Sequence, residues 1–451
     1  MDNGFAAEYG ERVRVKVLEQ MERCIAEREL AGPQAPVLLM VSGGSDSTAL
    51  AYLAADLHGR GVLGPLGILH VNHRLRGADA DADEEFVRRL AALLGIRLFA
   101  RSIDVGAIAA EEGGNVEAVA RRERYRAADE ALVELCRLAA APIAEGRIFT
   151  AHTADDRVES FYMRSIVGTG PGGFRSMRYR NGRVCRPLLD EGRQELRDYL
   201  RERAEAGLPV ARDAAGGGLG GPRGARPDAG GGACGEGRRG AGALWREDAT
   251  NAHTDRFRAF VRHEIVPRAK ERNPHLLTTL TRTMNLVADE DDMLQAQADE
   301  LVERAVEWLE GSAEPTPVPL RTDPRSAGCL LLPAFGDAPL PLARRAVTGI
   351  LQRMLGADAR IETASVEAVL AGFAPAEPVA SQASAASPAW GGSAASDAPA
   401  PEPRSRALLA GIGAPRSGYV TNIQGDLAVS ANKRGVRIEP MAVFRARRKR
   451  G

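Results

Sequence analysis

The sequence has few cysteines, and none of them is spaced as a metal ligand or a redox pair. Sites of those kinds use cysteines or histidines only a few residues apart, as in Cys-x-x-Cys. The cysteines here are odd in number and widely separated: Cys24, Cys136, Cys185, Cys234 and Cys329. We therefore expect a reducing compartment and no metal cluster.

Long apolar runs and an excess of one charge are lacking as well. The first thirty residues alternate charged with apolar residues, and no uninterrupted apolar stretch reaches the roughly 20 residues that cross a bilayer. The 60 basic and 60 acidic residues cancel, so binding to nucleic acid would depend on local clusters of charge. These absences predict a cytoplasmic protein with no membrane partner.

What is present is a chain of 451 residues, 44% of them apolar, which is enough for two or three domains. Its first half repeats a short apolar run, a polar turn and a helical stretch, the rhythm of an α/β fold with a doubly wound parallel sheet. Strands are predicted at 36–41, 66–71, 97–103 and 147–151. Amphipathic spacing predicts helices at 47–57, 81–94, 116–138 and 155–166.

Changes in composition predict four parts: 1–270, 271–373, 374–405 and 406–451. The first part contains an insertion at about 207–243, mostly Gly, Ala, Arg and Pro, which is predicted to be disordered. The second is expected to be mainly helical, and the third is a low-complexity linker. The fourth alternates apolar and polar residues, which predicts a short β-hairpin, and it ends in a basic cluster.

A glycine-rich loop follows the first predicted strand. The apolar run ends at Val41, and helical periodicity starts directly after the loop. Strand, glycine turn and helix together aim unpaired backbone N–H groups at an anion. The loop consists of Ser42, Gly43, Gly44, Ser45, Asp46 and Ser47. The alternative interpretation is a tight turn before a capped helix, in which Ser45 and Asp46 serve only the orphan N–H groups.

This loop is not a Walker A motif, because no Gly-Lys-Ser/Thr occurs in the chain. It resembles instead the SGGxDS loop of the PP-loop ATPases, which bind the pyrophosphate of ATP and cleave between its α- and β-phosphates to adenylate a substrate. The resemblance implies ATP as a substrate. A carboxylate beside phosphate makes chemical sense if Mg²⁺ lies between Asp46 and the phosphate oxygens.

Two further segments place polar residues where α/β proteins bind ligands, at the carboxyl ends of predicted strands. His70 begins a polar run that ends the second strand, and His152 follows the fourth. Asp156 and Glu159 come next and project from one side of the predicted helix. The alternatives are a polar loop in the first case and, in the second, acidic residues that suit the helix dipole.

A third segment, 114–125, predicts a helical face shared by Glu117, Arg121 and Arg124. By itself this pattern also fits a solvated, salt-bridged face. Taken in order, the three segments and the loop resemble the tRNA(Ile)-lysidine synthase family, as do the stretches 168–174, 186–189 and 245–251. The resemblance covers about residues 35–275 without the insertion.

The resemblance implies an enzyme that uses ATP to attach free L-lysine to C2 of the wobble cytidine in an isoleucine tRNA with anticodon CAU. The modified tRNA then reads AUA instead of AUG. Two alternatives stay open: another PP-loop enzyme, such as a tRNA thiolase or an amide-forming synthetase, and a non-catalytic nucleotide-dependent RNA-binding protein. The oligomeric state is also open, with a homodimer among the alternatives.

Residue roles follow from the same resemblance. ATP is expected to contact the loop residues Ser42, Gly43, Gly44, Ser45, Asp46 and Ser47 together with His70 and His152. The catalytic set is Asp46, Arg121, Arg124, Asp156 and Glu159. Asp156 and Glu159 are also expected to hold the lysine ammonium, whose pKa of about 10.4 keeps it charged at neutral pH. Carboxylates favour that charged form, so holding the amine and activating it oppose each other.

For tRNA, the stretch 160–189 contains six arginines and no acidic residue, which predicts a basic track for phosphates. An exposed loop in an arginine-rich protein is the alternative. The expected tRNA contacts are Arg175, Arg178, Arg180, Arg183, Arg258 and Arg262. The chain departs from the family's usual residues at Arg157, Ser160, Val167 and Ala259.

Overall fold

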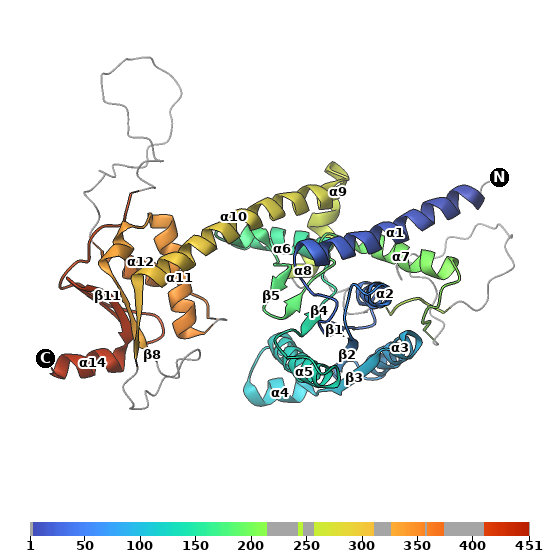
Figure 1. The fold of residues 1–451 in the computed structure, drawn as a ribbon, viewed down its shortest axis with the longest axis horizontal. Coiled ribbons are helices and arrows are strands. Elements are labelled where there is room, and N and C mark those ends of the chain that lie inside the picture. The colour runs from blue at the N-terminus through green and yellow to red at the C-terminus, as the bar shows by residue number, and fades with distance from the viewer. Residues whose placement is uncertain are drawn as a thin grey trace, which may run out of the picture. The chain divides into compact units, whose positions relative to one another are not determined.

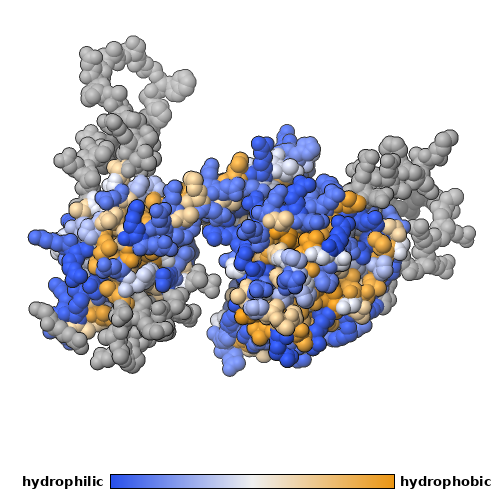
Figure 2. Space-filling model, in the orientation of Figure 1, coloured by the Kyte–Doolittle hydropathy of each residue, from blue (hydrophilic) through white to orange (hydrophobic). Residues whose placement is uncertain are grey.

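A computed structural model describes residues 3–213, 242–246, 257–310, 326–356, 359–373 and 410–450. The chain forms two compact units, Met1–Ala288 and Asp289–Gly451 (Figure 1). The division falls within helix α10 (Leu276–Ala305) and not at the predicted boundary near residue 270. Figure 2 shows hydrophilic residues over much of the drawn surface of both units, as expected of side chains that face water.

The first unit is built on a six-stranded sheet with the order β3-β2-β1-β4-β6-β5. Its strands are β1 (Val37–Met40), β2 (Leu66–Asn72), β3 (Arg97–Ser102), β4 (Arg147–Phe149), β5 (Arg180–Asn181) and β6 (Val184–Cys185). All neighbours pair in parallel except β5, which is antiparallel to β6 at the edge. The predicted α/β fold with a parallel sheet is confirmed.

Helices cover both faces of this sheet. They are α1 (Asn3–Glu27), α2 (Ser45–Gly59), α3 (Ala78–Leu94), α4 (Val105–Glu112), α5 (Val116–Leu138), α6 (Ala154–Val167) and α7 (Arg193–Glu205). Alternate residues of β1 explain the two layers: Val37 and Leu39 pack with α1, α2, α3 and α7, whereas Leu38 packs with α5. In Figure 1, α2 and α5 accordingly lie on different sides of the strands.

The second unit contains a five-stranded antiparallel sheet with the order β7-β8-β11-β10-β9. Its strands are β7 (Val306–Glu310), β8 (Ser326–Leu331), β9 (Val420–Ile423), β10 (Leu427–Asn432) and β11 (Gly435–Pro440). Three helices accompany them: α11 (Leu340–Leu355), α12 (Thr363–Leu370) and α14 (Met441–Arg450). Because β8 pairs with β11, the predicted helical part 271–373 and the tail 406–451 are not separate domains. The predicted linker, residues 374–405, lies outside the described residues.

The edges of the predicted insertion pack against the first unit. The backbone N–H of Ala211 donates to the hydroxyl of Tyr52 at 2.6 Å, and Asp213 bonds to the carbonyl of Ala243 at 2.9 Å. Residues 207–213 and 242–243 were therefore wrongly assigned to a disordered segment, while 214–241 lie outside the described residues. Within the part of the chain that is described, no helix is long and apolar enough to span a bilayer.

Candidate active site

The phosphate loop lies at the carboxyl end of β1, between β2 and β4, where the direction of strand order reverses. Ligands of open α/β sheets bind at this point. Gly43 has φ +96°, a conformation that only glycine adopts readily. Gly44 precedes the first turn of α2 and provides no side-chain cap. The N–H groups of that turn are therefore available to an anion, which favours the phosphate loop over the alternative of a capped helix.

The loop hydroxyls hold the turn in shape. Ser42 Oγ and Ser47 Oγ lie 3.1 Å apart, and Ser47 Oγ donates to the carbonyl of Gly44 at 3.1 Å. The carbonyl of Gly43 accepts from the backbone N–H of Arg246 at 2.9 Å. The segment after the insertion thus closes over the loop. The remaining residues of that motif, 247–251, lie outside the described residues.

Arg193, the first residue of α7, joins the loop to the two predicted lysine ligands. Its guanidinium contacts Asp46 at 3.1 Å, Asp156 at 3.2 Å and Glu159 at 3.7 Å. Burial raises the pKa of Asp46 above its ordinary value, although the charge of Arg193 opposes the rise. Sequence reasoning missed Arg193, because an arginine in the first turn of a helix carries no signal of its partners.

Asp156 and Glu159 are both buried at the start of α6. Thr153 and Asp156 form a capping box, in which Asp156 Oδ2 accepts from the N–H of Thr153 at 3.0 Å. The other oxygen, Oδ1, faces Arg193. Asp156 therefore caps the helix with one oxygen and contacts Arg193 with the other, while its role toward a substrate stays a prediction. Burial alone would raise its pKa, but the guanidiniums of Arg193 and Arg258 lower it below the ordinary value.

Arg258 and Arg262 bind the carboxylate pair. They lie on α8 (Phe257–Phe260) and on the π-helical turn η3 (Val261–Ile265). Arg258 Nε is 2.9 Å and Arg262 Nε 2.6 Å from the carboxylate of Glu159. A buried carboxylate requires such partners. Both arginines therefore have a role at these carboxylates in this structure, and the expectation that they also belong to a basic track for tRNA phosphates stays a prediction.

The two predicted ATP-contacting histidines lie in surroundings that disfavour the charged imidazolium. His70 Nδ1 lies 2.9 Å from the carbonyl of Val41, and His152 Nδ1 lies 2.9 Å from Thr150 Oγ1. Burial lowers the pKa of His70, and it lowers that of His152 to about 4. Neutral imidazoles offer ATP hydrogen bonds and not charge.

Arg121 and Arg124 lie on α5. The charge of Arg124 lowers the pKa of both His73 and His152, after the larger effect of their burial. Arg124 is therefore near enough to both histidines for its charge to act on them. Arg121 lies over the ring of Tyr125, with its Cζ 5.2 Å from the ring centroid. Of the predicted catalytic set, the structure brings Asp46, Asp156 and Glu159 together directly and places the two arginines on a neighbouring helix.

The predicted basic track divides into exposed and buried arginines. Arg178, Arg180 and Arg183 are exposed around the short strands β5 and β6. Arg175 and Arg186 are buried, and Arg186 donates to the carbonyl of Arg178 at 2.8 Å. Arg175 was wrongly predicted to meet tRNA phosphates, because its side chain is 7% exposed in this structure. The exposed three remain candidates.

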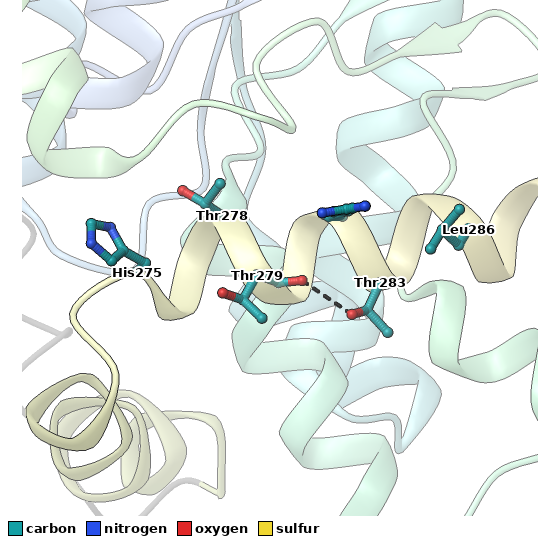
Figure 3. Close-up of a pocket in the computed structure, with 6 residues that line it drawn as sticks. His275, Thr278, Thr279, Thr283 and Leu286 are labelled. Carbon is teal, nitrogen blue, oxygen red and sulfur yellow. Dashed lines mark hydrogen bonds between the residues drawn. The ribbon is translucent and has the colours of Figure 1, made fainter.

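A shallow hollow of about 420 Å³ lies along one side of α10 (Figure 3). It is lined by His275, Thr278, Thr279, Arg282, Thr283 and Leu286. The hydroxyl of Thr283 donates to the carbonyl of Thr279 at 3.1 Å. None of these residues is a predicted site residue or contacts the carboxylate cluster, so the hollow is not part of the candidate active site.

Glu191, two residues before Arg193, is a buried carboxyl whose ionisation should oppose folding. Its Oε2 is buried and lacks a hydrogen-bond partner among the described residues. Burial, followed by the charges of Glu195 and Asp190, raises its pKa from 4.5 to about 8. Because the folded pKa lies above the unfolded one, stability is full below pH 4.5 and is lost as the pH rises through about 8.

We therefore expect Glu191→Gln to raise Tm by several degrees relative to the wild-type protein at about pH 8.5, and by much less at about pH 4.5. Thermal unfolding of both proteins across this range measures the difference. A difference in Tm that is the same at every pH would contradict the assignment of a raised pKa to Glu191.

Comparison with known proteins identifies the family. A model of the PP-loop domain matches residues 14–206. The tRNA(Ile)-lysidine synthase of Chlorobaculum tepidum is 31% identical over 293 residues, which cover 64% of this chain and 72% of that protein. The chain belongs to the tRNA(Ile)-lysidine synthase family. The lysidine synthase of Thermus thermophilus is 32% identical over 335 residues, 73% of this chain. The match covers 51% of that relative, so the chain spans about half its length.

Among solved structures, the U34-tRNA thiolase NcsA from Methanococcus maripaludis matches with a TM-score of 0.42 and 14% identity, over 62% of this chain and 80% of that one.

The four residues at which the chain departs from the usual lysidine synthase residues differ in how deeply they are buried. Val167 is exposed, and Ser160 and Ala259 are half-buried. Arg157, between the two site carboxylates, is wholly buried.

Proposed function

We propose that the chain attaches free L-lysine to C2 of the wobble cytidine in an isoleucine tRNA with anticodon CAU, using ATP that is cleaved to AMP and pyrophosphate. The observation that carries this proposal is the position of Arg193, which contacts both the phosphate loop at Asp46 and the carboxylates of Asp156 and Glu159. A nucleotide on the loop and an amine on the carboxylates would then be neighbours, as adenylation followed by amine attack requires.

The reaction has two steps. In the first, the oxygen on C2 of the cytidine attacks the α-phosphate of ATP, the bond to the β-phosphate breaks, and pyrophosphate leaves. In the second, the lysine ε-amine attacks C2 and loses a proton, and the oxygen departs as part of AMP. Backbone N–H groups at the start of α2 support the first step by binding phosphate.

Mg²⁺ fits this site as an ion held jointly by protein and nucleotide. Asp46 Oδ1 accepts only the hydroxyl of Ser45 among the contacts described, at 2.9 Å, which leaves it able to bind a cation. A single carboxylate plus phosphate oxygens is a common setting for Mg²⁺. When bound, the ion would supply positive charge beside the phosphates. Asp46 would hold it, while Arg193 keeps that carboxylate in place.

The lysine site has to bind the charged ε-ammonium and also release a proton from it, and the arginines around the site bear on both requirements. Asp156 and Glu159 can accept hydrogen bonds from the ε-ammonium. Arg193, Arg258 and Arg262 already contact the same two carboxylates. The three guanidiniums offset the negative charge of the carboxylates, which reduces the tendency of the pair to keep a bound amine in its charged form.

The cysteines argue against a tRNA thiolase. Such an enzyme uses a reactive thiolate, which requires a low pKa and access to substrate. All four cysteines of the described residues are buried: Cys24, Cys136, Cys185 and Cys329. Burial raises the pKa of Cys24 to about 12 and that of Cys185 to about 11. Cys234 lies outside the described residues.

For tRNA, the proposal uses the exposed arginines Arg178, Arg180 and Arg183. Each phosphate neutralised by a cation contributes about −0.7 to −0.9 to the slope of log K against log salt. We expect the triple variant R178Q/R180Q/R183Q to bind the isoleucine tRNA more weakly, with a slope shallower by about two to three. Filter binding between low and physiological salt measures this, with R88Q on α3, where Arg88 pairs with Glu84, as the control. An unchanged slope in the triple variant would remove these arginines from the tRNA surface.

The products of ATP cleavage test the first step. We expect ATP labelled on its α-phosphate to yield labelled AMP only when the isoleucine tRNA is added. Formation of ADP, or of AMP at the same rate without tRNA, would contradict adenylation of the tRNA base.

A further inference from the structure

Arg157 lies between the two site carboxylates in sequence but faces away from them. Its side chain is 0% exposed. Successive residues of a helix are rotated by about 100°, so Arg157 projects from a different face of α6 than Asp156 and Glu159. While those two residues meet Arg193, Arg258 and Arg262, the guanidinium of Arg157 enters the interior of the unit. A change at Arg157 can therefore reach the carboxylates only through the position of the helix.

The guanidinium connects α6 to three other segments. It donates to the hydroxyl of Tyr179 at 3.2 Å, to Asp190 Oδ1 at 3.3 Å and to Asn285 Oδ1 on α10 at 2.9 Å. The hydroxyl of Tyr179 in turn donates to Asp190 Oδ1 at 2.6 Å. The backbone carbonyl of Arg157 accepts from Ser176 Oγ at 2.9 Å. Helix α6 is thus fixed on its inner side by the loop that precedes β5, by the segment before α7 and by α10.

Burial of the Arg157 guanidinium costs free energy, because the charge loses its contact with water. Only Asp190 balances it among these partners, and the Nε of Arg157 has no hydrogen-bond partner within the described residues. Buried ion pairs often add little to stability, because desolvation offsets their attraction. The hydrogen bonds do fix the orientation of Arg157, since a planar guanidinium with several acceptors allows one orientation. A helix that carries substrate-binding residues needs to be held rigidly in this way.

We propose that Arg157 is a positioning residue that sets the orientation of Asp156 and Glu159 toward the lysine substrate. The inference rests on the proposed function, since it concerns the lysine site of that reaction. Tyr179 lies between Arg178 and Arg180 in sequence, two of the exposed arginines proposed for tRNA. Loosening α6 should therefore weaken the use of lysine more than the binding of ATP by the loop at the start of α2.

The test compares Arg157→Gln with Arg203→Gln. Arg203 is a matched control: it is also buried, pairs with Asp56 at 2.8 Å and contacts the hydroxyl of Tyr199 at 3.3 Å, but it lies at the far end of α7. We expect R157Q to raise KM for lysine by at least about tenfold and KM for ATP by less than about twofold. R203Q should lower Tm without changing the ratio of the two KM values.

Two further variants keep the test decisive if R157Q folds poorly. Tyr179→Phe, which removes the hydroxyl that links Arg157 and Asp190, should raise KM for lysine in the same direction. Arg157→Lys retains the positive charge but lacks the planar guanidinium, and it should restore part of the affinity for lysine that R157Q loses. The positioning role is wrong if the wild-type protein incorporates lysine and both R157Q and Y179F have the wild-type KM for lysine. It is also wrong if these variants raise KM for lysine and KM for ATP by the same factor. A wild-type protein that incorporates no lysine would overturn the proposed function as well.

Discussion

Arg193→Gln should abolish most of the lysidine-forming activity, with kcat/KM for tRNA lowered by at least about 10³-fold. The reason is its shared position: Arg193 contacts Asp46, Asp156 and Glu159 at once. Removing it leaves three carboxylates close together in a partly buried site, and it disconnects the phosphate loop from the lysine site. Initial rates of incorporation of labelled lysine into tRNA measure the loss.

Arg193→Lys and Arg201→Gln complete this experiment. Lysine keeps the charge but cannot reach three carboxylates as a planar fork does, so we expect it to recover only a small part of the rate. Arg201 lies on the same helix, pairs with Asp198 at 2.6 Å and is outside the cluster. R201Q should retain wild-type kinetics. An R193Q protein that folds and works at the wild-type rate would show that the cluster has no part in the reaction.

The double variant Asp156→Asn/Glu159→Gln should raise the lysine requirement and leave ATP binding in place. A hydrogen bond to a charged group contributes about 1.5–3 kcal/mol, so losing two charged acceptors corresponds to a KM for lysine higher by roughly 10² to 10⁴. Lysine titration of the tRNA reaction measures this change, and equilibrium binding of labelled ATP provides the second readout.

Glu264→Gln is the matched control, because Glu264 is an exposed acid on η3 that pairs with Arg268 at 3.0 Å. It should leave both measurements unchanged. The two carboxylates would lose their assignment if the double variant used lysine as the wild-type protein does. Loss of ATP binding in the double variant would instead indicate that they support the nucleotide site.

The phosphate loop could be predicted because its signals are local. A buried strand, a glycine turn and a helix follow one another between residues 37 and 59, and each is specified by neighbouring residues. The other predicted strands and helices of the first half have the same local character, and all of them are present in the structure. The strand order was not predicted, and in the structure β4 lies next to β1, which places the loop close to the start of α6.

Arg193 and the roles of Arg258 and Arg262 could not be predicted, because their partners are far away in sequence. Arg193 is separated from Asp46 by 147 residues, and Arg262 from Glu159 by 103. Clustered arginines in a tRNA-modifying family suggest phosphate binding. Only the fold shows that both Arg258 and Arg262 contact buried carboxylates.

The second unit illustrates the same limit for strands. Strand β7 follows α10 without a break, and its residues continue the apolar spacing of the helix, so 306–310 were predicted to be helical. Their strand conformation depends on pairing with β8, which pairs in turn with β11 near the end of the chain. Pairing over such a separation leaves no local pattern, because strand propensity depends on the neighbours that the fold provides.

The most direct test of the central claim is transfer of labelled L-lysine to tRNA. The protein is incubated with ATP, labelled lysine and transcripts of the isoleucine tRNA that carry either CAU or a control anticodon. The account predicts label in the CAU transcript alone, with one AMP formed for each lysine attached. No label in either transcript, or equal label in both, would contradict it.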